Sequence, residues 1–371
     1  MRVAILHDHL SFIGGGERTV MTLAKALAAD VFVTDLDPEL PVRMGFPDVR
    51  VGEIAKVPNT PILRQNRQAK AFSELDLSEY DAYILSGNWA VFASKRHIPN
   101  IWYCHTPVRV FYDLRGQFLG DLSAPKRAIA RRWIAKMQKR YESAVGSVQR
   151  IVANSRNVQG RIERYLHRKA DVVNPPVKTS RYHFDRIGDF WLSVNRLSHE
   201  KRLGLQVESF RQLPGERLIV AGGPQVGVDA KRFVRSLQPP DNVQFLGEVE
   251  EGKLIDLYAS CRGFIATSED EDFGLTPIEA MASGKIVLAA DEGGYRESVV
   301  HGETGWLLPA KPDAFADKIK SIKAEEIEAM KDKCIERAAQ FDEGRFIERM
   351  KQQVLTVMER GGDRRNNRAH A

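Results

Sequence analysis

Short runs of Val, Ile and Leu alternate with helical patterns along this chain, and the whole alternation occurs twice. Buried parallel strands are near-continuous apolar runs joined by helices, so this pattern predicts parallel sheets covered on both faces. A length of 371 residues is too great for one ordinary core. We therefore expect an α/β protein with two doubly wound, Rossmann-like domains in tandem. The expected strands are 2–6, 31–34, 81–86, 100–104 and 150–155 in the first half, and 190–194, 216–223, 242–247, 263–268 and 285–290 in the second.

A pair of prolines, Pro175 and Pro176, marks the expected boundary between the two domains, because it stops any regular element there. The expected domains span 1–176 and 177–341, and a helical pattern follows over 342–360. The end of the chain, 361–371, is interpreted as a flexible tail. Ligands of open α/β sheets bind outside the carboxyl ends of the strands. The loops that follow the strands are therefore the segments to inspect, and two facing sheets would form a cleft.

The cysteine content and the absence of long apolar runs favour an intracellular location. No apolar run approaches the roughly 18 residues of a transmembrane helix, and the N-terminus lacks the apolar segment of a signal peptide. Cys104, Cys261 and Cys334 are far apart, which matches neither a zinc motif nor a disulfide framework. We expect a cytoplasmic protein.

The positive charge of the chain is concentrated in one segment. The formal net charge is +6, but residues 109–169 hold 15 Lys and Arg against 4 Asp and Glu. Nucleic acid, an anionic membrane or a phosphorylated substrate could each account for such a segment. Within 125–141, apolar residues recur at helical spacing among the cations, which fits either a membrane-interfacial helix or a stripe packed on its own sheet. We find no nucleic-acid motif and no aromatic platform, so nucleic acid is not the expected partner.

An acidic stretch over 268–284, SEDEDFGLTPIEAMASG, lies at the carboxyl end of an expected strand. Thr276 resembles a helix N-cap, and Glu279 three residues later completes a capping box. The N–H groups of Leu275 and Thr276 would then form an anion site at the helix start. Two carboxylates, Glu271 and Glu279, are too few for a metal cage but suit a clamp that binds hydroxyl groups. The remaining acids of the stretch are interpreted as solvated loop residues.

Residues 271–279, EDFGLTPIE, resemble the signature of the family 4 retaining glycosyltransferases of GT-B fold. The resemblance extends through 280–308 and covers roughly 1–358. It implies transfer of a hexose from a nucleotide diphosphate sugar to an acceptor hydroxyl with retention at the anomeric carbon. It also implies that Glu271 holds sugar hydroxyls and Glu279 the ribose, that no metal or cofactor is needed, and that the C-terminal helix packs back on the first domain. The implied donor-binding residues of this stretch are Phe273, Gly274, Leu275, Thr276 and Glu279.

Two further segments of the second half match the family's donor site. Arg196 and Lys201 follow the first strand of that half in the sequence NRLSHEKR. Two cations that open toward one site suit a diphosphate, and the family's phosphate-binding Arg and Lys have this spacing. The segment 242–261 resembles the nucleobase-binding region, where Gly247 is the implied contact.

The first half carries a glycine-rich loop and a histidine motif. Gly14, Gly15 and Gly16 follow the first expected strand. Their sequence matches neither the G-x-G-x-x-G dinucleotide fingerprint nor the Walker A motif. They resemble the family's Gly-Gly-x-Glu loop, with Glu17 as its acid, which is implied to reach the diphosphate. His105, in the sequence HTPVR, resembles a family subset rich in mannosyltransferases acting on lipid-linked saccharides, and it is implied to lie near the reaction centre. Arg109 is a weaker candidate, for contact with the acceptor or with a phosphate.

Two short motifs of the first half resemble metal-binding sequences, but we interpret neither as a metal site. His7 and His9 lie on one side of an extended segment without a third ligand in the motif. The sequence DLD at 35–37 mimics the metal motif of another glycosyltransferase fold without its context. Where many relatives have Asn-Gly-Val-Asp, this chain has NPPVK at 174–178, which leaves the role of an acid there open.

The leading interpretation is a hexosyltransferase that uses a nucleotide sugar, with mannose from GDP-mannose expected as the donor. The expected acceptor is a saccharide or a polyprenyl-linked saccharide, with possible peripheral contact at the inner face of the cell membrane. The alternatives are a glucosyl- or N-acetylglucosaminyltransferase that uses a UDP-sugar, a non-catalytic basic module for nucleic acid or membrane, and a sugar epimerase of the same fold. Charge on the leaving phosphate would be stabilised by Arg196, by Lys201 and by the backbone N–H groups of Leu275 and Thr276.

Overall fold

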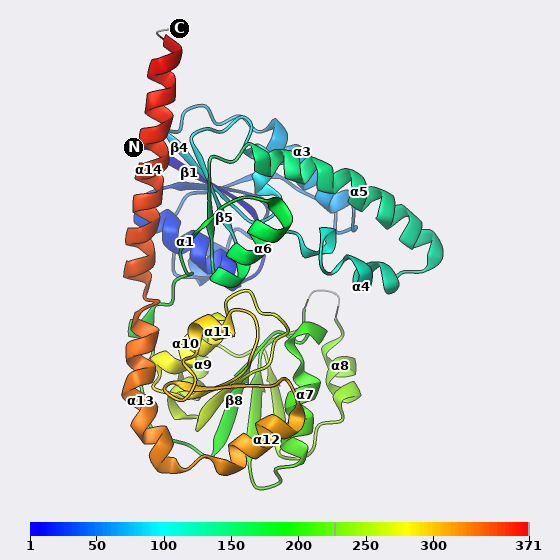
Figure 1. The fold of residues 1–371 in the computed structure, drawn as a ribbon, viewed down its shortest axis with the longest axis vertical. Helices are drawn as coiled ribbons and strands as arrows, with labels where there is room; N and C mark the ends of the chain where they lie inside the picture. The colour runs from blue at the N-terminus through cyan, green and yellow to red at the C-terminus, as the bar shows by residue number, and fades with distance from the viewer. Residues whose placement is uncertain (226–227, 370–371) are drawn as a thin grey trace. The chain divides into compact units, whose positions relative to one another are not determined.

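A computed structural model describes residues 1–225 and 228–369 as two compact units. Unit 1 contains residues 1–175 together with 344–371, and unit 2 contains residues 176–343. The chain passes from unit 1 to unit 2 between Pro175 and Pro176, the proline pair at which the sequence analysis placed the boundary. Both units have the predicted architecture, a parallel sheet with helices packed against it (Figure 1).

Unit 1 is built on a seven-stranded parallel sheet in the order β3-β2-β1-β4-β5-β6-β7. Along β1, Val3 and Ile5 face one hydrophobic core, whereas Ala4 and Leu6 face the other, as the two-residue period of a strand requires. The sheet is therefore buried on both faces. Its strands are β1 (Val3–Leu10), β2 (Asp30–Leu36), β3 (Val51–Ala55), β4 (Ala82–Ser86), β5 (Asn100–Cys104), β6 (Arg150–Ala153) and β7 (Asp171–Val172).

Helices cover both faces of the unit 1 sheet. The core on one side takes residues from α1 and α14, and the core on the other side takes residues from α3, α5 and α6. In α14 the buried side chains recur at helical spacing, which anchors this C-terminal helix on unit 1. The helices are α1 (Gly15–Leu27), α2 (Leu40–Arg43), α3 (Leu63–Glu74), α4 (Arg115–Gly120), α5 (Ala124–Gly146), α6 (Arg156–Leu166) and α14 (Glu343–Ala369), with short 3-10 helices η1 (Ala90–Ala93) and η2 (Arg109–Phe111).

The C-terminal helix is longer than the sequence analysis predicted. We expected it to end at residue 360 and to be followed by a flexible tail, but α14 continues to Ala369. Gly361 and Gly362 do not end it, since an interior glycine costs only about 1 kcal/mol relative to alanine and does not forbid helical backbone. The last two residues of the predicted tail, 370–371, lie outside the described part of the chain.

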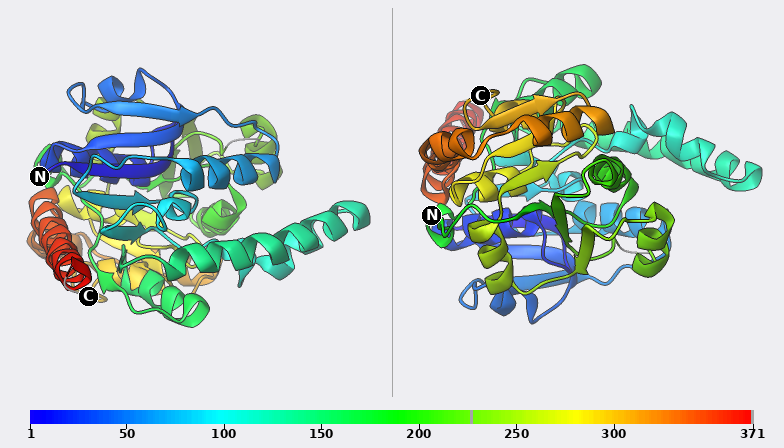
Figure 2. Two further views of the ribbon diagram at one scale, coloured as in Figure 1. Left: turned by 90° about the horizontal axis from the view of Figure 1, so that it is seen from above. Right: turned by 90° about the horizontal axis from the view of Figure 1, so that it is seen from below.

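The basic helix α5 runs away from the sheet of unit 1 at its N-terminal end, together with α4 (Figures 1 and 2). Its other end packs on the sheet, where Ile134, Met137 and Tyr141 are fully buried. Most of the apolar stripe of this helix therefore belongs to the core, although Ile129 on the projecting part is 62% exposed. In the ranges described here, no helix combines the length and the apolar character needed to cross a bilayer.

Unit 2 contains a six-stranded parallel sheet in the order β10-β9-β8-β11-β12-β13. A single continuous core joins this sheet to α7, α9, α10, α12 and α13. The strands are β8 (Phe190–Val194), β9 (Arg217–Ala221), β10 (Val243–Gly247), β11 (Gly263–Ala266), β12 (Val287–Ala290) and β13 (Gly305–Leu308). The helices are η3 (Thr179–Arg181), η4 (His199–Lys201), α7 (Leu203–Arg211), α8 (Ala230–Leu237), α9 (Glu251–Ser260), α10 (Leu275–Ala282), α11 (Tyr295–Ser298), α12 (Pro312–Ser321) and α13 (Ala324–Ala339).

Candidate functional site

The acidic stretch of unit 2 forms the loop between β11 and α10, as predicted, but the helix begins earlier than expected. Gly274, and not Thr276, is the N-cap, and α10 starts at Leu275. The predicted capping box is therefore wrong. Gly274 adopts a left-handed conformation at φ 86°, which places Leu275 and Thr276 in the first turn and Glu279 beyond it. Only glycine fits there, because an added Cβ atom would lie 2.7 Å from the ring of Tyr295.

Glu271 and Lys201 meet at the carboxyl edge of the unit 2 sheet. The Lys201 Nζ atom lies 2.6 Å from Glu271 Oε2, and the two side chains are 15% and 20% exposed. Burial alone would raise the pKa of the Glu271 carboxyl, but the charges of Lys201 and Arg196 hold that pKa below its usual range. Glu271 is therefore an anion at neutral pH that accepts hydrogen bonds, and it does not serve as a proton donor.

A glycine pair after β12 supports the backbone of Glu271. The Gly294 N–H group donates a hydrogen bond to the Glu271 carbonyl at 2.7 Å. Added Cβ atoms on Gly293 and Gly294 would lie 2.4 to 2.6 Å from the backbone of residues 271–273, so only glycine permits this close approach. Arg202, which the sequence analysis did not single out, ion-pairs with Glu292 of the same loop and with Glu269 at 3.3 Å. The loop that carries Glu271 is thus held by two neighbouring segments.

Two other predicted donor residues of the stretch, Glu279 and Phe273, differ from each other in burial. Glu279 accepts a hydrogen bond from the Tyr258 hydroxyl at 2.8 Å, and it is only partly buried. This hydrogen bond fixes one carboxylate oxygen of Glu279. The Phe273 side chain is 2% exposed and packs against Phe341, so its ring belongs to the core and only its backbone can face a ligand.

Gly247 ends β10 with a left-handed backbone at φ 71°, and an added Cβ atom there would meet open space. Its carbonyl accepts a hydrogen bond from Gly222, which closes the ends of β9 and β10 together. Arg196 is exposed in the loop after β8, and Lys201 ends the short helix η4 that follows. The structure therefore brings Arg196, Lys201 and Glu271 together at one edge of the sheet.

In unit 1, the glycine-rich loop forms the start of α1, and Glu17 lies buried beneath it. The Glu17 Oε1 atom is 3.7 Å from His7 Nε2 and also 3.7 Å from His9 Nδ1. Burial alone would lower the pKa of His7, but the Glu17 carboxylate raises that pKa above its ordinary value. Burial would raise the pKa of Glu17, and the two histidines lower it. An added Cβ atom on Gly14 would lie 2.5 Å from Glu17 Oε2, so the backbone at Gly14 closely approaches this carboxylate.

Ser86 links His7 to His105. The Ser86 Oγ atom lies 3.0 Å from His105 Nε2 and 3.2 Å from His7 Nδ1. Burial, followed by the charge of His7, lowers the pKa of His105 to about 4. His105 is therefore a neutral imidazole at pH 7. An added Cβ atom on Gly16 would lie 3.5 Å from the His105 ring, so the glycine loop packs directly against it.

The acids of the two motifs considered for a metal, Asp8 between His7 and His9 and Asp35 of DLD, have other partners. The Asp8 carboxylate accepts hydrogen bonds from the N–H groups of Asn88, Trp89 and Ala90 at 2.7 to 2.8 Å. Asp35 ion-pairs with Arg64. Across residues 1–225 and 228–369, no group of three or more His, Cys, Asp and Glu side chains is arranged to hold a metal ion.

Two family models together match most of the chain. The model described as Glycosyltransferase Family 4 matches residues 13–181, and the model described as Glycosyl transferases group 1 matches residues 185–341. The chain belongs to the family 4 glycosyltransferases. The matched residues include every predicted site residue, from the glycine loop to Glu279.

Among the relatives of this family 4 glycosyltransferase is the human alpha-1,3/1,6-mannosyltransferase ALG2, at 32% identity over 35% of this chain and 36% of the relative. The lipopolysaccharide core biosynthesis mannosyltransferase LpcC of Rhizobium leguminosarum is 47% identical over 19% of each chain. The chain thus matches only about a third and a fifth of the lengths of these two relatives. The structure of Anabaena HepE in complex with UDP and glucose is similar at a TM-score of 0.74 and 19% identity, covering 96% of this chain and 100% of that chain, which supports the GT-B fold.

Arg109, the weaker acceptor candidate in this glycosyltransferase, has a strong partner of its own. Its guanidinium group donates two hydrogen bonds to Asp113 Oδ2, at 2.9 and 2.6 Å. Much of its charge is therefore matched within η2 and the turn that follows it.

Sequence reasoning missed Ser86, Tyr258 and Arg202 as residues of the two clusters. Ser86 ends β4 next to β1 and β5, so its place at a strand end was a usable indication. Tyr258 and Arg202 carry no such local indication, since their contacts with Glu279 and Glu292 join segments distant in sequence.

Proposed function

We propose that this chain transfers mannose from GDP-mannose to an acceptor hydroxyl with retention at the anomeric carbon. The observation that carries the proposal is the contact of Lys201 with Glu271 at the start of α10, in a chain that belongs to family 4. The contact combines a cation suited to a phosphate with a carboxylate suited to sugar hydroxyls.

The proposed chemistry in unit 2 is electrostatic stabilisation of the leaving group. When the bond from the sugar to the diphosphate breaks, negative charge develops on the β-phosphate. We assign Arg196, Lys201 and the first-turn N–H groups of α10 to that charge, in the role that a divalent metal has in other enzymes. No metal or cofactor is required in this scheme. The roles of His105 and of the glycine loop, Gly14 to Gly16, stay predictions from the family resemblance.

The two glutamates are assigned to different parts of the donor. Glu271 is ionised and partly exposed, so it can accept hydrogen bonds from two sugar hydroxyls. Glu279 has one oxygen fixed by Tyr258, and we assign the carboxylate to the ribose. Neither glutamate needs a raised pKa, so the acid–base pair of glycoside hydrolases has no counterpart in the proposal.

For the acceptor, we propose a saccharide carried on a lipid, such as a polyprenyl-linked saccharide. One relative is a mannosyltransferase of lipopolysaccharide core biosynthesis by its name. The cations of α5 and the exposed Ile129 on its projecting part would suit peripheral contact with an anionic membrane at the inner face of the cell membrane. Vesicle co-sedimentation with and without Ile129→Asp tests this contact, because the variant should lose binding if the apolar side chain inserts.

Calorimetric titration of GDP and of UDP into the purified chain, in EDTA, tests the donor assignment. We expect GDP to bind without added metal and to bind at least about tenfold more weakly to the Lys201→Gln variant, because a charge-assisted contact to the diphosphate is lost. Lys320→Gln is the matched control, since Lys320 is an exposed lysine on α12 of the same unit. Incubation with GDP-mannose should then release GDP, and NMR should show the α anomer in the first product.

Three results would decide against parts of this proposal. Binding of UDP in place of GDP would favour a glucosyl- or N-acetylglucosaminyltransferase. A β-anomeric first product would exclude retention. If neither nucleotide binds, the donor site assigned to unit 2 is wrong, and the basic module for nucleic acid becomes the better explanation.

A further inference from the structure

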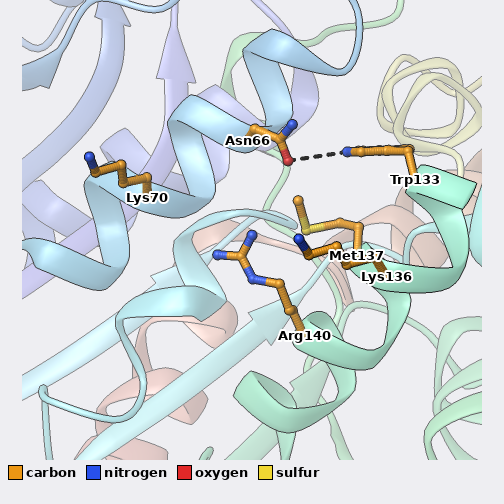
Figure 3. A pocket seen from close by; sticks show the side chains of 6 residues that line it. All are labelled: Asn66, Lys70, Trp133, Lys136, Met137 and Arg140. Atoms are coloured by element: carbon orange, nitrogen blue, oxygen red, sulfur yellow. Dashed lines mark hydrogen bonds between the residues drawn. The ribbon is translucent and has the colours of Figure 1, made fainter. Parts of the chain in front are cut away.

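A cavity lies in unit 1, between α3 and α5, and it shares no residue with the histidine cluster. The cavity has a volume of about 480 Å³, which is within the range of small-molecule sites. Six residues line it. They are Asn66 and Lys70 of α3, and Trp133, Lys136, Met137 and Arg140 of α5 (Figure 3).

The lining residues come from one side of each helix. Asn66 and Lys70 are four residues apart, and the four residues of α5 follow the spacing of three and four that forms a single helix face. Met137 is fully buried at the base. The Asn66 Oδ1 atom accepts a hydrogen bond from Trp133 Nε1 at 3.2 Å, which joins the two helices and fixes the indole ring as one wall.

The cavity is strongly cationic. Figure 3 shows Lys136 and Arg140 reaching from α5 toward α3, and Lys70 lies one turn beyond Asn66. Lys70 Nζ is 3.7 Å from Glu74 Oε1 in a surface pair, which neutralises it weakly. Within the ranges that the structure describes, no carboxylate lies within 4.0 Å of Lys136 or Arg140. Three like charges thus line one concavity that contains no acid.

The cations and the apolar wall of the cavity suit a ligand that has both an anionic group and a less polar part. Cations in a concave site attract anions, and the forked guanidinium of Arg140 matches two oxygens of a phosphate. The flat Trp133 ring and Met137 provide an apolar wall against which a sugar ring or a glycerol moiety can pack. The volume exceeds the space that one phosphate group needs.

We propose that the cavity between α3 and α5 binds a phosphate ester that carries a polyhydroxyl group. The ester has two possible sources, a phosphorylated sugar in solution or the headgroup of an anionic phospholipid. The proposal rests on the cavity alone and is independent of the donor assignment in unit 2.

Trp133 is the reporter for the test. Glucose 6-phosphate is titrated into the full chain while tryptophan emission and, separately, calorimetric heat are recorded. A parallel arm uses vesicles of phosphatidylglycerol, with phosphatidylcholine vesicles as the neutral comparison. The variant Trp133→Phe identifies the part of the optical response that comes from this residue, because the chain has five tryptophans.

The decisive comparison is between two double variants of equal charge change. Lys136→Gln with Arg140→Gln removes both α5 cations of the cavity. Arg131→Gln with Lys139→Gln removes one exposed arginine and one exposed lysine of α5 that do not line it. We expect the first pair to weaken binding by about tenfold or more, and the second pair to change it less than about threefold.

Each outcome has one meaning. A saturable response to glucose 6-phosphate that only the cavity variant loses supports the proposal and assigns the ligand to a soluble ester. A response to phosphatidylglycerol alone, with the same dependence on the variants, supports it and assigns the ligand to a lipid headgroup. Equal loss in both double variants would show that general charge drives binding and would overturn the proposal. An absence of binding in both arms would also overturn it.

Discussion

Lys201 and Glu271 lie 70 residues apart in the sequence, yet their charged groups are 2.6 Å apart in unit 2. Neither side chain is fully exposed, and the loop that carries Glu271 is held through the hydrogen bond from Gly294. Because this hydrogen bond fixes the backbone at Glu271, the carboxylate would need little reorganisation for the sugar contact that we propose. Such preorganisation is what makes a polar group effective in a catalytic site.

The Glu271→Gln variant should separate sugar recognition from nucleotide recognition. We expect its rate of mannosyl transfer or donor hydrolysis to fall by about 10- to 100-fold, since hydrogen bonds to a charged group are worth about 1.5 to 3 kcal/mol. Its affinity for GDP, which lacks the sugar, should stay near that of the wild type. Kinetics with GDP-mannose and calorimetry with GDP measure the two quantities. Glu303→Gln, an exposed turn residue, is the control, and an equal loss of GDP affinity in Glu271→Gln would contradict the assignment.

His105 should act as a neutral imidazole over the whole physiological range. Its pKa is lowered to about 4 by burial and by the charge of His7, so its protonation does not change between pH 5.5 and 8. We expect the NMR chemical shifts of the His105 ring to stay constant in this interval. His105→Gln should lower the rate without removing any limb of the pH–rate profile above pH 5.5. A titration of this ring near pH 6.5 would show that the site is more solvated than its contacts indicate.

The Glu17–His7 pair should give unit 1 a stability that depends on pH. The pKa of Glu17 is lowered, so its contribution is present above about pH 4.5 and is lost as pH falls through the folded value. The pKa of His7 is raised, so its contribution is present below about pH 6.5 and is lost as pH rises through the folded value. The two contributions coexist between these limits.

Thermal unfolding of Glu17→Gln across pH 5 to 9 checks this expectation. The difference in Tm between the wild type and the variant should be largest near pH 5 to 6.5 and should shrink as the pH rises. Glu39→Gln, an exposed residue of the same unit, should show no such trend. If the difference for Glu17→Gln is the same at all these pH values, His7 is not charged in the folded state.

The fold could be predicted from the sequence because it depends on a local pattern. Every strand expected from an apolar run is present, since burial on both faces requires such a run. The prediction missed three strands. One of them, β13 (Gly305–Leu308), has the sequence GWLL and carries a short apolar run that was overlooked, whereas β3 and β7 lack this signal. Three of the five residues in β3 (Val51–Ala55) are Gly, Glu and Ala, while β7 (Asp171–Val172) has only two residues. The pairing of β3 and β7 comes from the neighbouring strand and not from their own composition.

The site was predicted as a set of residues but not as a set of contacts. Family resemblance gave Lys201 and Glu271 separately, and only the fold shows that they meet. The Thr276–Glu279 capping box failed because the rule considers only the residues within it. Gly274 can adopt the left-handed backbone that starts the helix earlier, and Tyr258, from α9, supplies the donor for Glu279. Both effects depend on residues outside the four-residue motif.

Gly274→Ala should destabilise unit 2 while Gly252→Ala should not. At Gly274 the backbone is left-handed and an added Cβ atom would lie 2.7 Å from the Tyr295 ring, so strain and overpacking together should cost about 2 to 4 kcal/mol. Gly252 is helical in α9, and an added Cβ atom meets nothing within 4 Å, so alanine there should stabilise by about 0.5 to 1 kcal/mol. Urea unfolding of both variants measures the difference. Equal stability of the two would mean that both the backbone at residue 274 and the Tyr295 ring relax, and the loop that carries Glu271 would then be less rigid than its contacts indicate.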